Sequence, residues 1–104
     1  MAQFDVYRNR DPGSRRQIPY LLDIQSNLLS QLATRVVVPL VREDRFGLPA
    51  RRLNPIFEVA VVRVVMSTQE LAGIHISELG DGVGTLAMHR DDIVAALDFI
   101  IQGF

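Results

Sequence analysis

Residues 20–41 read YLLDIQSNLLSQLATRVVVPLV, and we expect the rest of the chain to pack around them. The second half, residues 34–41, is the densest run of β-branched residues in the sequence, and such residues favour a pleated, half-buried surface. This pattern predicts a central strand, in which Pro39 marks a bulge or the end of regular pairing because it donates no ladder hydrogen bond. Residues 20–24 predict a second strand close enough to pair with the first, and residues 28–33 leave room for only one or two turns of helix.

Strand patterns also stand on both sides of this centre. Residues 2–8 alternate between apolar and polar side chains, as a half-buried strand does, and the turn-forming residues 9–17 predict a hairpin onto the next strand. Residues 42–52 are polar, contain Gly and Pro, and predict a connecting loop. Residues 56–66 form an almost continuous β-rich run that is long for one strand, so we expect a bend, a bulge or a tight hairpin inside it.

The last third of the chain changes from strand periodicity to helix periodicity. Residues 71–79 alternate between apolar and polar side chains as a strand would, and residues 80–82, Gly-Asp-Gly, predict a turn. A helix is predicted after them, with Asp91 and Asp92 at its N-terminus, where carboxylates accept amide hydrogens, and Gly103 at its end. The residues that recur at the spacing of one helical face are Ile93, Ala96, Leu97, Ile100 and Ile101.

Length and composition restrict the class of protein. With 104 residues and 48% hydrophobic side chains, the chain predicts one domain, residues 1–104, whose small core an oligomer would help to cover. No apolar run approaches the roughly 18 residues of a membrane span, and we expect no secretion signal. The absence of Cys excludes disulfides, thiol nucleophiles and Cys-ligated zinc, and it fits a cytoplasmic protein.

Charge is divided unevenly along a chain whose net charge is −1. Residues 1–18 carry four Arg against two Asp, and residues 42–52 carry four Arg against one Glu and one Asp, so each segment is +2. In residues 54–104 two Arg face seven acids, which gives −5. The basic segments are either solvated loops or a pair of Arg-rich loops that receive an acidic peptide through bidentate contacts. The near-neutral total argues against general or sequence-specific nucleic-acid binding.

The sequence offers little chemistry for catalysis. His75 and His89 lie 14 residues apart and belong to no close-spaced metal motif, so no metal site and no cofactor is predicted. No Ser lies in a nucleophile elbow, and no catalytic residue is predicted. Asp23 and Arg35 each interrupt an apolar strand, and they form either a buried ion pair or, as the alternative, a functional pair.

The central stretch also carries a resemblance to a known family. Asp23-Ile24-Gln25-Ser26, a leucine-containing spacer and then Arg35-Val36-Val37-Val38-Pro39-Leu40 resemble the central signature of the CcdB toxin family, which are poisons of bacterial DNA gyrase. Gln3-Phe4-Asp5-Val6-Tyr7 resembles the first strand of that family. His89-Arg90-Asp91-Asp92-Ile93, the apolar helix after it and Gly103 resemble its C-terminus. These matches follow the order of the family and cover most of the chain.

The resemblance implies a fold and a mode of action. Members of the family have an SH3-like, partly open barrel of antiparallel strands with one C-terminal α-helix, so an α+β, mostly β fold is expected. They are homodimers that bind the gyrase A subunit and trap it with its DNA cleaved, which requires no catalytic group, and we therefore expect a toxin that is not an enzyme. The gyrase-binding residues implied for this chain are Gln102, Gly103 and Phe104, and Gln102 stands where the family has a Trp.

The resemblance also implies an antitoxin, a small protein whose disordered C-terminal segment folds onto the toxin and neutralises it. Positive charge for such a segment is provided by Arg8, Arg10, Arg15 and Arg16. Two other functions stay open. The family's fold is similar to that of the MazF-class endoribonuclease toxins, and Arg35 resembles an Arg used there. The other alternative is a CcdB-like binding module without gyrase-poisoning activity.

Overall fold

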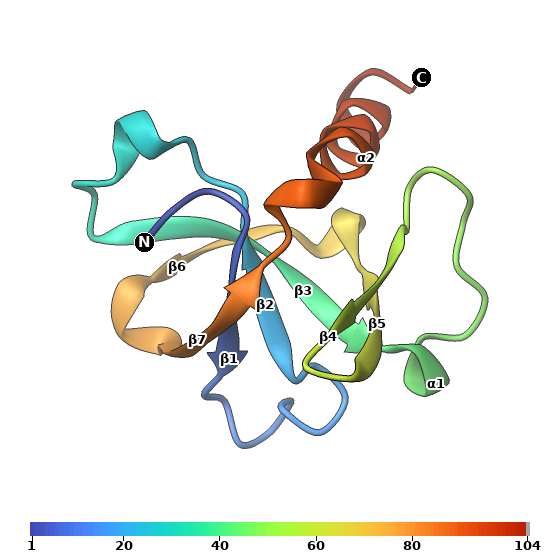
Figure 1. Cartoon of the computed structure of the whole chain (residues 1–104), viewed down its shortest axis with the longest axis horizontal. Coiled ribbons are helices and arrows are strands. Elements are labelled where there is room, and N and C mark those ends of the chain that lie inside the picture. Colours follow the sequence, from blue (N-terminus) through green and yellow to red (C-terminus); the bar gives the residue numbers. More distant parts are fainter. Residues whose placement is uncertain (104) are drawn as a thin grey trace.

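The computed structural model describes residues 1–103 and shows a curled antiparallel sheet with one long helix at its C-terminal end (Figure 1). The predicted α+β, mostly β fold, an SH3-like partly open barrel with a C-terminal helix, is confirmed. None of the helices that the structure describes is long and apolar enough to cross a membrane. The strands are β1 (Asp5–Asn9), β2 (Tyr20–Asp23), β3 (Thr34–Arg42), β4 (Ile56–Val59), β5 (Val62–Met66), β6 (Ala72–His75) and β7 (Leu79–Thr85). The helices are α1 (Glu43–Phe46) and α2 (Arg90–Gln102), with single 3-10 turns η1 (Asn27–Leu29), η2 (Thr68–Glu70), η3 (Ile76–Glu78) and η4 (Ala87–His89).

Strand β3 is the centre of the sheet, as its β-branched sequence predicts. The strand order is β4-β5-β3-β2-β1-β7, and β6 also pairs with β3. One edge of β3 pairs with β2, and the other edge pairs first with β6, at residues 34–37, and then with β5, at residues 40–42. Pro39 lies between these two segments, so its missing N–H falls at the gap between β6 and β5. The prediction that Pro39 marks an end of regular pairing is therefore confirmed for this edge.

The sheet buries apolar side chains on both faces. Alternation along the strands places Val6, Leu22 and Val38 on the face that α2 covers, where Ile93 and Ala96 of the helix are fully buried. The opposite face carries a second, smaller cluster of buried apolar side chains, so both faces of the central strands are shielded from solvent. The buried members of this second cluster are Tyr7, Leu21, Val37 and Leu79.

Residues 56–66 form a tight hairpin, which is one of the three predicted outcomes. Strands β4 and β5 pair up to Val59↔Val62, so Ala60 and Val61 alone make the turn. Both residues have positive φ, 48° and 61°. Two-residue hairpins require this left-handed conformation, but neither Ala nor Val favours it.

The predicted strand over residues 71–79 is too long. Strand β6 ends at His75, and Ile76 and Ser77 belong to η3 instead. The His75 ring accepts a hydrogen bond from the Ser77 amide, while the Glu78 carboxylate accepts one from the His75 amide. This reciprocal capping favours a helical turn over the strand that the alternating pattern predicts.

The turn predicted at residues 80–82 is also wrong, because these residues lie inside β7. A Cβ at Gly80 would lie 3.0 Å from the backbone oxygen of Arg8, so this position needs glycine where β7 approaches β1 closely. The pairing of the two strands is irregular as well, with register shifts on both sides of Tyr7. The glycines therefore serve a close, bulged contact between strands rather than a reversal of the chain.

Helix α2 has nearly the predicted bounds, but its start differs. The N-cap residue is His89, whose side chain bonds no amide of the described chain, and Asp91 and Asp92 lie inside the first turn. The two carboxylates therefore act on the helix dipole rather than as caps. Gly103 ends the helix as predicted, with a left-handed φ of 83°.

Residues 42–52 are not a plain connecting loop, because α1 begins directly after β3. Glu43 of this short helix accepts a hydrogen bond from the Arg63 guanidinium of β5, with 2.8 Å between Oε1 and Nε. This contact lowers the pKa of Glu43 and raises the pKa of Arg63. The pair joins the start of the segment to the β4–β5 hairpin.

Candidate functional site

Asp23 and Arg35 form an ion pair on the face of the sheet opposite to α2. The Arg35 guanidinium donates to one carboxylate oxygen of Asp23, from Nη2 at 2.6 Å and from Nε at 2.9 Å, and both side chains are 0% exposed. The other carboxylate oxygen accepts a hydrogen bond from the Gln25 amide. The prediction of a buried pair is confirmed, and the pair joins β2 to β3.

Gln25 extends this network, in a role that its place in the sequence does not predict. Its side-chain oxygen accepts a hydrogen bond from the Val36 amide, and its side-chain nitrogen donates to the Leu29 carbonyl, both at 2.9 Å. Gln25 therefore fixes the loop that contains η1 onto β3. The residues that carry the family resemblance at this point, Asp23 to Ser26, hold the centre of the fold together, and the only signal in the sequence was their place between two strands.

Tyr7 lies on the same face and is buried. Burial raises the pKa of its phenol above the ordinary value of 10.0, and the negative charges of Asp5 and Asp23 act in the same direction. The phenol donates a long hydrogen bond, 3.4 Å, to the Asp5 carboxylate. A neutral, buried phenol is not available as a general base at neutral pH.

The residues considered for catalysis do not converge on one point. Arg35 is enclosed and paired with Asp23, so it does not reach a substrate. The His75 ring is used in the cap of η3, and the His89 ring packs against Phe57 with 5.0 Å between ring centroids. Within residues 1–103 no group of three or more His, Cys, Asp or Glu side chains could hold a metal ion.

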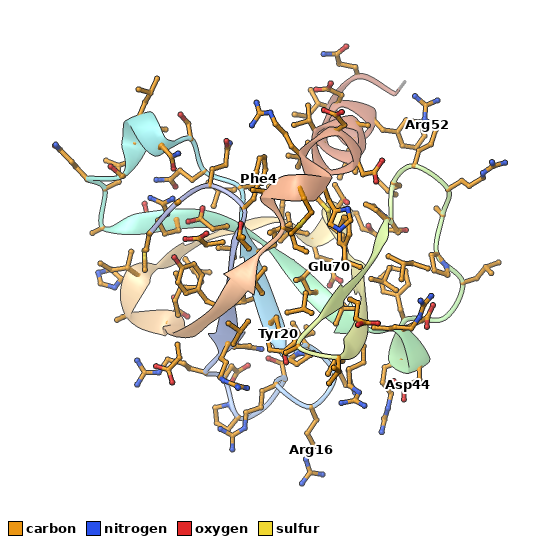
Figure 2. The ribbon with its side chains drawn as sticks, viewed as in Figure 1. Phe4, Arg16, Tyr20, Asp44, Arg52 and Glu70 are labelled. Carbon is orange, nitrogen blue, oxygen red and sulfur yellow. The ribbon has the colours of Figure 1, made fainter. Side chains whose placement is uncertain are left out.

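The four arginines predicted to bind an antitoxin are all exposed. They belong to β1 and to the connection from β1 to β2, and Figure 2 shows Arg16 pointing outward from that end of the molecule. Arg8, Arg10 and Arg15 line one hollow together with Asp81, whereas Arg16 is not among its described lining residues. In the part of the chain that the structure describes, none of the four takes part in an ion pair.

The acid of this loop, Asp11, is bonded within the loop itself. Its carboxylate accepts hydrogen bonds from the Ser14 hydroxyl at 2.8 Å and from the Gly13 amide at 3.1 Å. Both hydrogen bonds hold the pKa of the Asp11 carboxyl below its ordinary value, and the one from Ser14 has the larger effect. The Asp11 charge therefore orders the loop, and the arginines beside it stay accessible to a partner.

The predicted gyrase-binding residues lie at the C-terminal end of α2. Gln102 and Gly103 are exposed there, and Ile101 just before them is 77% exposed. Figures 1 and 2 show this end of α2 at the opposite end of the molecule from Arg16. Phe104 lies outside the described residues.

These features together define a class of protein. A curled antiparallel sheet with one C-terminal helix is typical of small β-rich proteins with an SH3-like, partly open barrel. Comparison with known families gives a more specific result, because the model of the family described as CcdB protein matches residues 3–103. The chain belongs to the CcdB family.

A solved structure shares the fold. An endoribonuclease from a mycobacterial species is similar to this chain with a TM-score of 0.73 and 17% sequence identity, over 97% of this chain and 90% of that one. At this identity the likeness shows a common fold and does not extend to activity.

Proposed function

We propose that the protein is the toxin of a type II toxin–antitoxin pair, which binds the A subunit of DNA gyrase, traps the enzyme with cleaved DNA and is neutralised by a cognate antitoxin. The observation that carries this proposal is membership of the CcdB family over residues 3–103. The described site supports a binding mechanism rather than an enzymatic one, because Arg35 is buried and the two His are used elsewhere. The protein acts in the cytoplasm, where gyrase is found.

The effector surface in this proposal is residues 102–104. The accessible end of α2 supports this role, since a partner can reach Gln102 and Gly103 without unfolding the helix. An arginine of gyrase over an aromatic ring would contribute about 0.5–2 kcal/mol, and the amide side chain of Gln102 does not supply this contact. Phe104 supplies an aromatic ring two positions later. We therefore expect gyrase trapping that is weaker than in family members with Trp at this place.

A gyrase cleavage assay with purified protein tests the proposal. We expect the parent protein to convert supercoiled plasmid into linear DNA after denaturation, Gln102→Trp to do so at lower concentration, and deletion of residues 102–104 to abolish the effect with the fold intact. Gln17→Trp is the matched control, because it adds the same ring to an exposed glutamine on the other end of the molecule. A truncated protein as active as the parent would show that the effector surface lies elsewhere.

The arginine loop is the proposed antitoxin surface. Alanine in place of both Arg15 and Arg16 should weaken binding of the antitoxin encoded beside the toxin gene and make the binding less dependent on salt, since each lost cation removes a screened attraction. Arg90→Ala is the control, because Arg90 is an exposed arginine outside both basic segments. An unchanged affinity and salt dependence would show that Arg15 and Arg16 are only solvated.

The shared fold supports a second candidate, an endoribonuclease toxin. The burial of Arg35 argues against it. Cells that arrest growth with intact RNA and linearised plasmid support the gyrase poison, whereas degraded RNA with intact plasmid supports the ribonuclease. Normal growth on expression supports a binding module without toxicity.

A further inference from the structure

A hollow of about 510 Å³ opens beside the connection from β1 to β2. Its floor is apolar and is made by Ile18, Leu21, Pro39 and Ile74. Three of these residues lie in paired strands, β2, β3 and β6, so the floor is held rigidly. The volume falls in the range of about 300–1,000 Å³ that is usual for binding pockets.

The polar groups at the rim of this hollow are already hydrogen-bonded. The Asn9 side-chain nitrogen donates to the Ser14 hydroxyl and to the Ile18 carbonyl, both at 2.9 Å. The carboxylates of Asp11 and Glu78 accept hydrogen bonds from the loop and from the cap of η3. An apolar floor whose neighbouring Asn9, Asp11 and Glu78 side chains already make hydrogen bonds favours an apolar side chain as the occupant, because such a side chain brings no polar group that needs a partner.

A basic hollow adjoins the apolar one. The two share Asn9 and Arg10, and the basic hollow is lined in addition by Arg8, Arg15 and Asp81. Arg10 donates from Nη1 to a carbonyl of η3 at 3.2 Å, and its guanidinium carries further N–H donors. Three guanidinium groups against one carboxylate favour an acidic occupant in this second hollow.

We propose that the two hollows bind one peptide segment, in which an apolar side chain fills the hollow of about 510 Å³ and acidic residues a few positions away pair with Arg8, Arg10 and Arg15. This inference rests on the proposed function, since the occupant is the segment of the antitoxin, and it adds the chemistry of that segment. Acidic charge alone is not sufficient, because salt screens exposed charge pairs and leaves the burial of an apolar side chain unaffected.

The test uses a phage-displayed library of random peptides about twelve residues long, selected against the purified full-length protein. Enriched sequences are synthesised with a fluorescent label, and their affinity is measured by fluorescence anisotropy. We expect one aliphatic or aromatic residue within a few positions of Asp or Glu residues. Glycine in place of that apolar residue should lower the affinity at least about tenfold.

Variants of the protein locate the binding. Ile74→Asp places a charge on the floor of the apolar hollow and should lower peptide affinity at least about tenfold. Ile56→Asp changes the same residue type on the outer strand β4 and should leave the affinity within about twofold. Where Ile74→Asp does not fold, as judged by circular dichroism, Ser77→Trp takes its place by covering the hollow from its exposed rim.

Three results would overturn the inference. They are a selection that enriches no peptides, a selection for acidic residues without an apolar one, and an affinity that Ile74→Asp and Ser77→Trp leave unchanged. Growth arrest on expression is measured separately, which keeps the two proposals distinguishable. If the protein is toxic but the selected peptides show no apolar preference, the proposed function stands and this inference is wrong. If the protein is not toxic but binds the expected peptides, this inference stands and the proposed toxicity is wrong.

Discussion

Asp23 and Arg35 place two opposite charges where the sheet excludes water. Burying such charges costs free energy that the pair recovers only with good geometry and further hydrogen bonds. Two N–H groups of Arg35 converge on one oxygen of Asp23, and Gln25 satisfies the other. Within residues 1–103, the Nη1 atom of Arg35 has no hydrogen-bond partner. The pair therefore fixes the position of β2 against β3 more effectively than it raises stability.

Removing one partner of this ion pair should lower the stability of the fold far more than replacing both partners by apolar side chains. Asp23→Ala leaves a buried, unpaired guanidinium, and we expect the free energy of unfolding to fall by about 3–5 kcal/mol. Asp23→Leu combined with Arg35→Met replaces the pair by apolar side chains and should recover most of this loss. Urea denaturation followed by circular dichroism measures both variants. A single variant as stable as the parent would contradict the structural role.

The sequence predicts this pair but not the role of Gln25. A charge buried inside an apolar strand requires an opposite charge to offset its desolvation, so Asp23 and Arg35 can be matched from their sequence context alone. A glutamine after a strand is equally typical of a turn, and its contact with Val36 depends on how the two strands align. Residue roles that arise from such alignment cannot be predicted from local sequence.

Among the elements, the β4–β5 hairpin reverses on residues that do not favour its conformation. Ala60 and Val61 both have positive φ, and the left-handed conformation costs about 1–2 kcal/mol per residue other than Gly. Val61 is 91% exposed, so its side chain gains little from burial. The turn therefore holds strain that sequence changes can release.

Asn-Gly at this turn should stabilise the protein. Ala60→Asn with Val61→Gly supplies the pair that such two-residue turns prefer, and we expect the free energy of unfolding to rise by about 1–2 kcal/mol. The same pair at Ala87 and Met88, which are exposed and do not have positive φ, is the control and should give no gain. Urea denaturation compares the two double variants with the parent. Equal stability of all three would show that the turn is not strained.

Periodicity predicts the long elements and fails at the short ones. Strand β3 and helix α2 carry enough β-branched or amphipathic sequence to decide their own structure. The end of β6 depends on the capping contacts of His75, which compete with the alternating pattern. The glycines of β7 are typical of a turn, and only the close approach of Arg8 explains why they lie in a strand. Local signals thus give the type of an element more reliably than its ends.

On the scale of the whole molecule, the two proposed binding surfaces lie far apart. Figure 2 shows Arg16 at one end, and Figure 1 shows the end of α2 at the other. The charge distribution and the family resemblance predict these surfaces from sequence. The apolar hollow was not predicted, because Ile18, Pro39 and Ile74 are distant in sequence and meet only when the sheet curls.

The homodimer remains a prediction, for which the valine run of residues 59–65 and the apolar helix are the candidate surfaces. Within the run, Val59, Val64 and Val65 are buried in the chain itself, whereas Val61 is 91% exposed. At the end of α2, Ile100 and Ile101 are exposed and offer apolar surface. A small chain gains from covering such residues with a second copy.

We expect light scattering to show a dimer at micromolar concentration and Ile101→Glu to shift it towards the monomer. A two-fold interface buries each residue twice, and at about 1.5–3 kcal/mol per apolar side chain the loss is about 3 kcal/mol or more, roughly a hundredfold in the dissociation constant. Leu48→Glu, at a residue that is 94% exposed in the segment after α1, is the control and should leave the dimer intact. A monomeric parent would contradict the homodimer, and a dimer that persists in Ile101→Glu would place the interface away from the end of α2.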